Sequence, residues 1–169
     1  METALVSLLL ITMLYGIVET SFAYRDALVV SSASRAGART AAGLPRDASF
    51  ATSAAAQVTS ALGSMDLSRV NTVWVFKANP ATGLPDSGSF TTCTTCVKFV
   101  PYGSSLVVSG TPGWTAASQN ACAGTVDTLG VYVQYRYPSR LGMFFKNTVM
   151  TESTVMRLEP YDRVGACKP

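Results

Sequence analysis

The chain has 169 residues, of which 48% are apolar and only 14% are charged, whereas soluble proteins carry about 25% charged residues. It contains no histidine, which excludes Ser-His and Cys-His nucleophile pairs, imidazole metal ligands and imidazole proton transfer. A net charge of +3, scattered along the chain, is too small to indicate nucleic-acid binding.

The apolar residues are concentrated at the N-terminus. No residue between Glu2 and Glu19 is charged, and the next charge after Glu19 is Arg25. A helix over residues 3–24 is roughly 33 Å long, enough to cross a hydrocarbon core of about 30 Å if Glu19 is tolerated inside it or at its edge. The run therefore predicts a membrane-spanning helix.

Two other interpretations of this run stay open. Ser21-Phe22-Ala23 has the small-x-small spacing of a signal-peptidase site, which would make the run a secretory signal cleaved after Ala23, but no Lys or Arg precedes Arg25. The other alternative is a core helix of a soluble protein, which the lack of a polar face disfavours.

The helical pattern continues beyond the apolar run. Arg35 and Arg39 are four residues apart and share one helix face, and Gly43-Leu44-Pro45 is a helix-stop signal. We therefore expect one helix of about 60 Å from Glu2 to Ala42. It would anchor the chain in a membrane and continue as a stalk that packs against a second unit, an α+β head over residues 43–169.

Alternating apolar residues predict a small antiparallel sheet in this head. Strands are expected at residues 70–77, 97–102 and 129–137, and the segment 148–158 favours a fourth. In the third strand Val131, Val133, Tyr135 and Tyr137 share one face. Asp47 is the expected N-cap of a helix over residues 48–62 that Gly63 ends. We expect loops at 79–89 and 103–113 and a short helix within 114–123.

All four cysteines, Cys93, Cys96, Cys122 and Cys167, lie in the head. An even number on the exported side of a membrane anchor predicts two disulfides, and three pairings are open. The Cys93-Thr-Thr-Cys96 spacing also occurs in redox sites and zinc ribbons. Here it lies in a Ser/Thr-rich loop, and neither a second CxxC nor a histidine is present to complete a zinc site.

No motif for catalysis or cofactor binding occurs in the sequence. The sequence lacks the hydrolase motifs Gly-x-Ser-x-Gly and Ser-x-x-Lys, a phosphate-binding loop ending in Lys, and an Asp-rich calcium loop. Glu159 and Asp162 flank Pro160 and are expected to be solvated turn residues. Aromatic residues such as Trp74 and Tyr132 are expected in the core or at a subunit interface. The sequence therefore predicts no enzyme, no cofactor and no metal.

Three blocks of the N-terminal region occur in a recognisable order. They are Glu2-Thr3-Ala4-Leu5-Val6, Gly16-Ile17-Val18-Glu19 followed by Tyr24, and Arg35-Ala36-Gly37-Ala38-Arg39-Thr40-Ala41-Ala42. In order and spacing they resemble the N-terminal region of TadE-like proteins, the pseudopilin-like minor components of tight adherence (Tad, Flp) pilus systems. Beyond Ala42 only a general likeness remains, a β-rich head that ends in Met156-Arg157-Leu158-Glu159.

The resemblance implies a pilin-like fold and a structural minor pilin or pseudopilin that assembles through its N-terminal helix in pilus biogenesis or adhesion. Its partners would be other pilin subunits in a homo- or hetero-filament, the assembly machinery and membrane lipid, with no nucleic acid. The chain would cross the inner membrane once with an exported head, or lie in the extracellular pilus. Prepilins carry a basic leader before the acid, whereas only Met1 precedes Glu2 here, so we assign no cleavage site.

Two acids are candidate assembly residues. Glu2 would lie at the positive end of the helix dipole. The resemblance implies that it meets a neighbouring subunit's N-terminal amine, and a capping or interfacial acid is an equal alternative. For Glu19 we favour a solvated or interfacial acid over an assembly role.

The alternative function is a membrane-anchored exported binding module unrelated to pili. Its loops at residues 83–96 and 106–114 would then contact a surface or a ligand.

Overall fold

The computed structural model describes residues 2–63, 65–140, 142 and 148–160, with residues 2, 4 and 5 described by their backbone alone. Its helices are α1 (Glu2–Ala42) and α2 (Phe50–Leu62), with short 3₁₀ turns at Leu67–Arg69 and Ala116–Ser118. Its strands are β1 (Val70–Ala78), β2 (Cys96–Tyr102), β3 (Ser105–Val108), β4 (Thr128–Arg136) and β5 (Val149–Arg157). The α+β class is therefore confirmed, and the division at residue 42 into two units stays a prediction.

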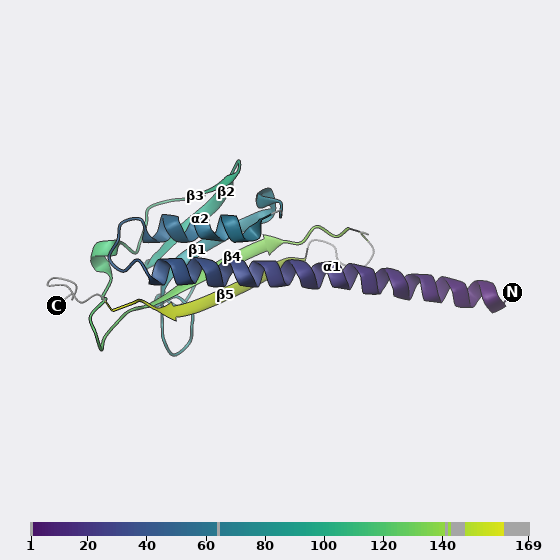
Figure 1. Cartoon of the computed structure of the whole chain (residues 1–169), viewed down its shortest axis with the longest axis horizontal. Coiled ribbons are helices and arrows are strands. Elements are labelled where there is room, and N and C mark those ends of the chain that lie inside the picture. The colour runs from purple at the N-terminus through teal and green to yellow at the C-terminus, as the bar shows by residue number, and fades with distance from the viewer. Residues whose placement is uncertain (1, 64, 141, 143–147, 161–169) are drawn as a thin grey trace.

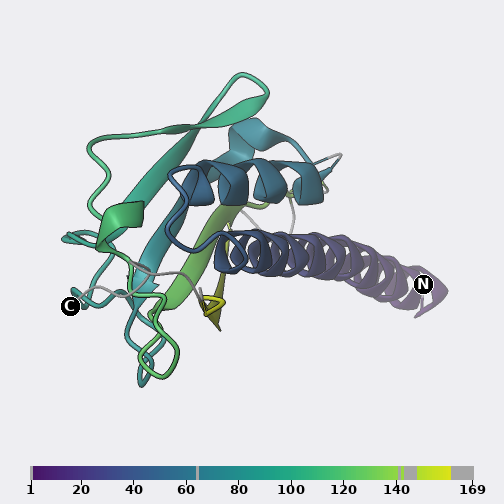
Figure 2. The same cartoon turned by 60° about the vertical axis from the view of Figure 1, so that its left-hand side comes forward.

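The strands form one antiparallel sheet in the order β3-β2-β1-β4-β5. Helices α1 and α2 lie side by side on one face of this sheet, and the N-terminal half of α1 extends well beyond the head (Figures 1 and 2). The predicted long helix packed on a small antiparallel sheet is confirmed.

The main core lies between the two helices and the sheet. The predicted inward face of β4 is confirmed, because Val131, Val133 and Tyr135 are buried, as is Tyr137 just beyond the strand. Val30 and Ala33 of α1 belong to the same buried cluster. The period-2 pattern of β4 thus correctly identified the residues that pack beneath the helices.

The two helices approach each other closely at Gly37. A Cβ added there would lie 2.6 Å from Val58 Cγ2 and 3.2 Å from the carbonyl oxygen of Ala54. Small buried residues continue this contact on both helices: Ala33, Ala38 and Ala41 on α1, and Ala51, Ala54 and Ala55 on α2. The Ala/Ser/Thr-rich composition of α2, which gives only a weak helical pattern, therefore permits close helix packing.

The prediction that Asp47 caps the second helix is wrong. The helix begins at Phe50 with Ser49 as N-cap. Ser49 donates its backbone N–H and its hydroxyl to Asp47 Oδ1 over 2.7 and 2.6 Å. The Asp47 carboxylate therefore closes a turn before the helix, as Asp often does, and Gly63 follows the last helical residue as predicted.

The prediction that residues 103–113 form a loop is also wrong in part. The segment expected as a loop contains strand β3, which pairs with β2 across a two-residue turn, Gly103-Ser104, with Gly103 at φ +60°. Pairing with β2 overrides the weak local signal of this segment. The short helix expected within residues 114–123 is the 3₁₀ turn Ala116–Ser118.

The opposite face of the sheet holds a second, smaller cluster. Phe76 of β1 is fully buried there and lies directly on Gly130 of β4, where a Cβ would collide with its ring. Phe90, from the segment between β1 and β2, packs edge-on against Phe76 with ring centroids 5.1 Å apart. This segment thus covers part of the face that the helices leave open.

Candidate functional site

The first part of α1, residues 3–18, is an apolar arm that extends away from the head (Figure 1). Large apolar side chains on all sides of it are exposed, among them Leu9, Ile11 and Met13. A helix that is apolar all round is stable when lipid or other helices surround it. Helix α1 is long and apolar enough to cross a membrane, which makes it a candidate membrane anchor.

One exposed stripe continues from this arm along the helix, on the face opposite the head. We call it the outer seam: Leu10, Leu14, Ile17, Ser21, Tyr24 and Leu28. The spacing alternates between four and three residues, the pattern by which one helix packs against another. Its five apolar residues are 53–68% exposed. The head-facing side, which includes Glu19, Asp26 and Val30, is buried.

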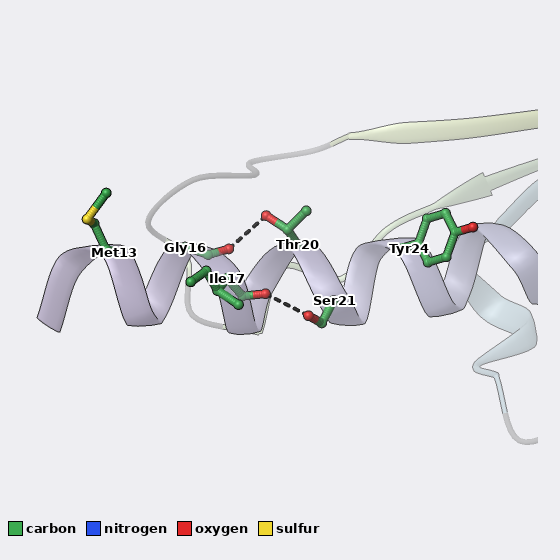
Figure 3. Close-up of a pocket in the computed structure, with 6 residues that line it drawn as sticks. All are labelled: Met13, Gly16, Ile17, Thr20, Ser21 and Tyr24. Atoms are coloured by element: carbon green, nitrogen blue, oxygen red, sulfur yellow. Dashed lines mark hydrogen bonds between the residues drawn. The ribbon is translucent and has the colours of Figure 1, made fainter. Parts of the chain in front are cut away.

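The middle of the outer seam borders a shallow notch lined by Met13, Gly16, Ile17, Thr20, Ser21 and Tyr24 (Figure 3). The hydroxyls of Thr20 and Ser21 donate back to the carbonyl oxygens of Gly16 and Ile17 over 2.7 and 2.8 Å. Because these bonds satisfy the hydroxyl protons within the helix, Thr20 and Ser21 need no hydrogen-bond acceptor from another molecule. Small residues of this kind let helices in a membrane approach closely.

Glu19 marks the point where the apolar arm meets the head. It is fully buried, and its Oε1 accepts hydrogen bonds from the Ser139 hydroxyl at 2.9 Å and the Arg140 backbone N–H at 3.2 Å. The Tyr137 hydroxyl donates to the backbone carbonyl oxygen of Glu19 at 3.4 Å. These contacts join the middle of α1 to the segment after β4, and we call them the head clasp.

Neighbouring contacts reinforce the head clasp. The Ser139 hydroxyl accepts a bond from the Gly142 N–H at 2.9 Å, and the Arg140 guanidinium lies 4.9 Å from the centre of the Phe22 ring. Burial raises the pKa of the Tyr137 phenol, and the nearby Glu19 carboxylate raises this pKa further. The phenol therefore keeps its proton at neutral pH and remains a donor.

The solvated alternative for Glu19 is wrong, because the head covers its carboxylate. The interfacial and assembly alternatives stay predictions. A sequence pattern cannot pair Glu19 with residues about 120 positions away. The one signal of this contact in the sequence was the inward face of β4, which continues to the buried Tyr137. Glu2 is the first residue of α1, but its side chain lies outside the described part of the structure. The structure therefore describes one of the two predicted assembly acids.

The cysteine pairing is settled at one position. Cys93 and Cys96 form a disulfide with their Cα atoms 5.7 Å apart, and Cys122 is also disulfide-bonded. Cys167 lies outside the described residues. The Cys93–Cys96 bond ties the end of the segment that carries Phe90 to the first residue of β2, so the prediction of a head stapled by a disulfide is confirmed.

Comparison with known proteins gives a family match at the N-terminal helix. Residues 1–39 match the family model of TadE-like proteins, the family suggested by the three sequence blocks. The match covers the apolar arm, Glu19 and most of the stalk, and it ends before the head. Neither the comparison with curated proteins nor the comparison with solved structures found a match.

Proposed function

We propose that this chain is a structural minor pilin or pseudopilin of a Tad-type pilus, which assembles with other pilin subunits through α1. The apolar arm would hold it in the inner membrane, with the head on the exported side, until the helix passes into a filament. The proposal gives the chain a role in pilus biogenesis and no enzymatic activity.

The observation that carries this proposal is the outer seam. It runs from the apolar arm to Leu28, past the residues that a bilayer needs, and it faces away from the head throughout. A simple anchor requires an apolar surface only within lipid, whereas packed pilin helices require one beyond it as well. The match of residues 1–39 to TadE-like proteins supports the same role, because this family belongs to Tad pilus systems.

The head clasp, on the side of α1 opposite the outer seam, also supports the proposal. It holds the head against the buried face of α1 from Glu19 onward. The outer seam thus stays uncovered, and each subunit would present it in the same orientation. Fixed geometry of this kind reduces the ordering that assembly requires.

Mechanical shearing of pili from the cells distinguishes a pilin from a membrane-anchored module unrelated to pili, because only a pilin leaves the cell with the filament. In cells that produce the Tad machinery, we expect the chain in the sheared filament fraction as well as in the membrane. Recovery exclusively from the membrane, in cells that make normal pili, would contradict the proposal.

Leu28→Asp tests the outer seam beyond the apolar arm. Leu28 is 53% exposed, so the substitution should leave the fold intact, but it places an unpaired carboxylate in the proposed helix contact. We expect at least a tenfold loss of the chain from sheared filaments, equivalent to about 1.4 kcal/mol, with normal amounts in the membrane.

The matched control is Leu84→Asp, the same change at a head residue that is 50% exposed. It should leave the filament fraction unchanged. Equal losses from both variants would show that a new surface charge, rather than the outer seam, disrupts assembly.

Glu2→Ala tests the first assembly acid. If Glu2 meets the N-terminal amine of a neighbouring subunit, the variant should insert into the membrane normally but fail to enter pili. Quantitative blots of membrane and sheared fractions measure the two steps separately. Normal insertion together with normal pilus entry would contradict the role and leave Glu2 as an interfacial acid.

A further inference from the structure

The sheet face turned away from both helices has an open region beside the segment that carries Phe90. The strand register places Lys98, Trp74, Tyr132 and Ser153 side by side across β2, β1, β4 and β5. Thr72 pairs with Gln134 in the next row. Two adjacent aromatic rings are therefore flanked by polar side chains on this face, and neither helix covers them.

A groove of about 420 Å³ lies in this region. Three rings line it, those of Trp74, Phe90 and Tyr132. The other lining residues are polar: Lys98, Gln134, Thr72 and Thr91. Both its volume and its mixture of ring surface with a few polar groups are typical of sites for small ligands.

The rings of the groove are held in place by their neighbours. Phe90 stacks on Tyr132 with ring centroids 4.4 Å apart and lies 5.9 Å from Trp74. Its other contact is edge-on with the buried Phe76, and the Cys93–Cys96 disulfide closes the segment three residues later. A rigid wall of this kind lowers the entropic cost of binding.

Charge narrows the class of ligand. Among the described residues that line the groove, Lys98 alone is charged, and its ammonium lies 5.3 Å from the centre of the Trp74 ring. No carboxylate of residues 2–63, 65–140, 142 or 148–160 lines the groove to repel an anion. Nearby, Gln134 donates to the Tyr132 hydroxyl at 3.5 Å, which leaves its carbonyl oxygen as an acceptor.

Three ligand classes differ in what they demand of this groove. Nucleic acid needs a row of cations for its phosphates, whereas the described lining of the groove supplies a single cation, Lys98. An apolar peptide side chain would strip water from Lys98, Gln134 and the threonines without replacing their hydrogen bonds. A sugar ring packs its C–H surface against aromatic rings and forms hydrogen bonds to polar groups through its hydroxyls. It therefore matches both the aromatic and the polar part of the groove lining.

We propose that this groove binds a saccharide that carries a carboxylate. The sugar ring packs against Trp74 and Phe90, its hydroxyls bond to Gln134 and Thr72, and its carboxylate pairs with Lys98. This site lies on the sheet face opposite α1, so it does not depend on the assembly role proposed above.

Titration of the full-length chain in detergent micelles tests the site through Trp74 fluorescence. The probes are hyaluronan tetrasaccharide, tetragalacturonate and 3′-sialyllactose, with chitotetraose as an uncharged counterpart. At least one acidic probe should give a saturable change with a Kd of about 1 mM or tighter, and chitotetraose should bind at least tenfold more weakly. The absence of a saturable change with every acidic probe at ~10 mM would overturn the proposal.

Three variants identify the groove while keeping Trp74 as the reporter. Lys98→Gln should weaken binding at least tenfold, whereas Arg136→Gln, which removes a positive charge from the same sheet face outside the groove, should change it less than twofold. Gln134→Leu should also weaken binding. Equal losses from both charge variants would indicate non-specific attraction, and tighter binding by Gln134→Leu would indicate an apolar partner; either result overturns the proposal.

Discussion

Replacement of Gly130 by Val is expected to destabilise the head by about 3 kcal/mol, although Val suits a central strand far better than Gly. The reason is the fully buried Phe76 ring, which occupies the space where any side chain on Gly130 would lie. Strand propensity spans about 1 kcal/mol, so displacement of a packed ring outweighs it. Denaturant unfolding of the full-length chain in detergent measures the difference.

A double-mutant cycle identifies the cause of this loss. Phe76→Ala removes the ring, so the two substitutions together should cost at least about 1 kcal/mol less than the sum of their separate effects. Ser153→Val, an exposed change on the same sheet face, should alter the stability by less than about 0.5 kcal/mol. Strictly additive losses would show that the collision between Gly130 and Phe76 is not responsible.

The second large effect is expected at the head clasp. Glu19→Ala removes the acceptor of the Ser139 hydroxyl and the Arg140 N–H, and a hydrogen bond to a charged group is worth about 1.5–3 kcal/mol. We expect the Arg140 amide to exchange its hydrogen at least tenfold faster and trypsin to cleave after Arg140 more readily, because the segment after β4 no longer holds to α1. Glu19→Gln, which keeps one acceptor oxygen, should have an intermediate effect.

Glu152→Ala is the matched control, because it removes a half-buried carboxylate from β5, where Glu152 pairs with Val133 and not with a residue of the head clasp. It should leave the Arg140 amide as protected as before. If Glu19→Ala also leaves this protection unchanged, then the hydrogen bonds to Glu19 do not hold the segment in place.

The sequence determined the elements whose residues carry a strong local pattern. The apolar run and the stop at Gly43 predicted α1 to its last residue, and alternation predicted β1, β2 and β4 to within one residue at each end. The family blocks around Glu19 and Arg35 identified the same region that matches TadE-like proteins. Hydrophobic periodicity depends on neighbours along the chain, which is why one sequence suffices to read it.

The tertiary structure alone decided how these elements meet. Residues 105–108 form strand β3 because they pair with β2. Residue 130 must be glycine because the Phe76 ring lies directly on it. Trp74 and Tyr132, expected in a core or at a subunit interface, pack against the smaller buried cluster and also line a groove. Glu19, expected to be a solvated or interfacial acid, is buried and accepts hydrogen bonds from Ser139 and Arg140. Each of these outcomes depends on contacts between residues far apart in the chain, and such contacts leave no periodic signal in a single sequence.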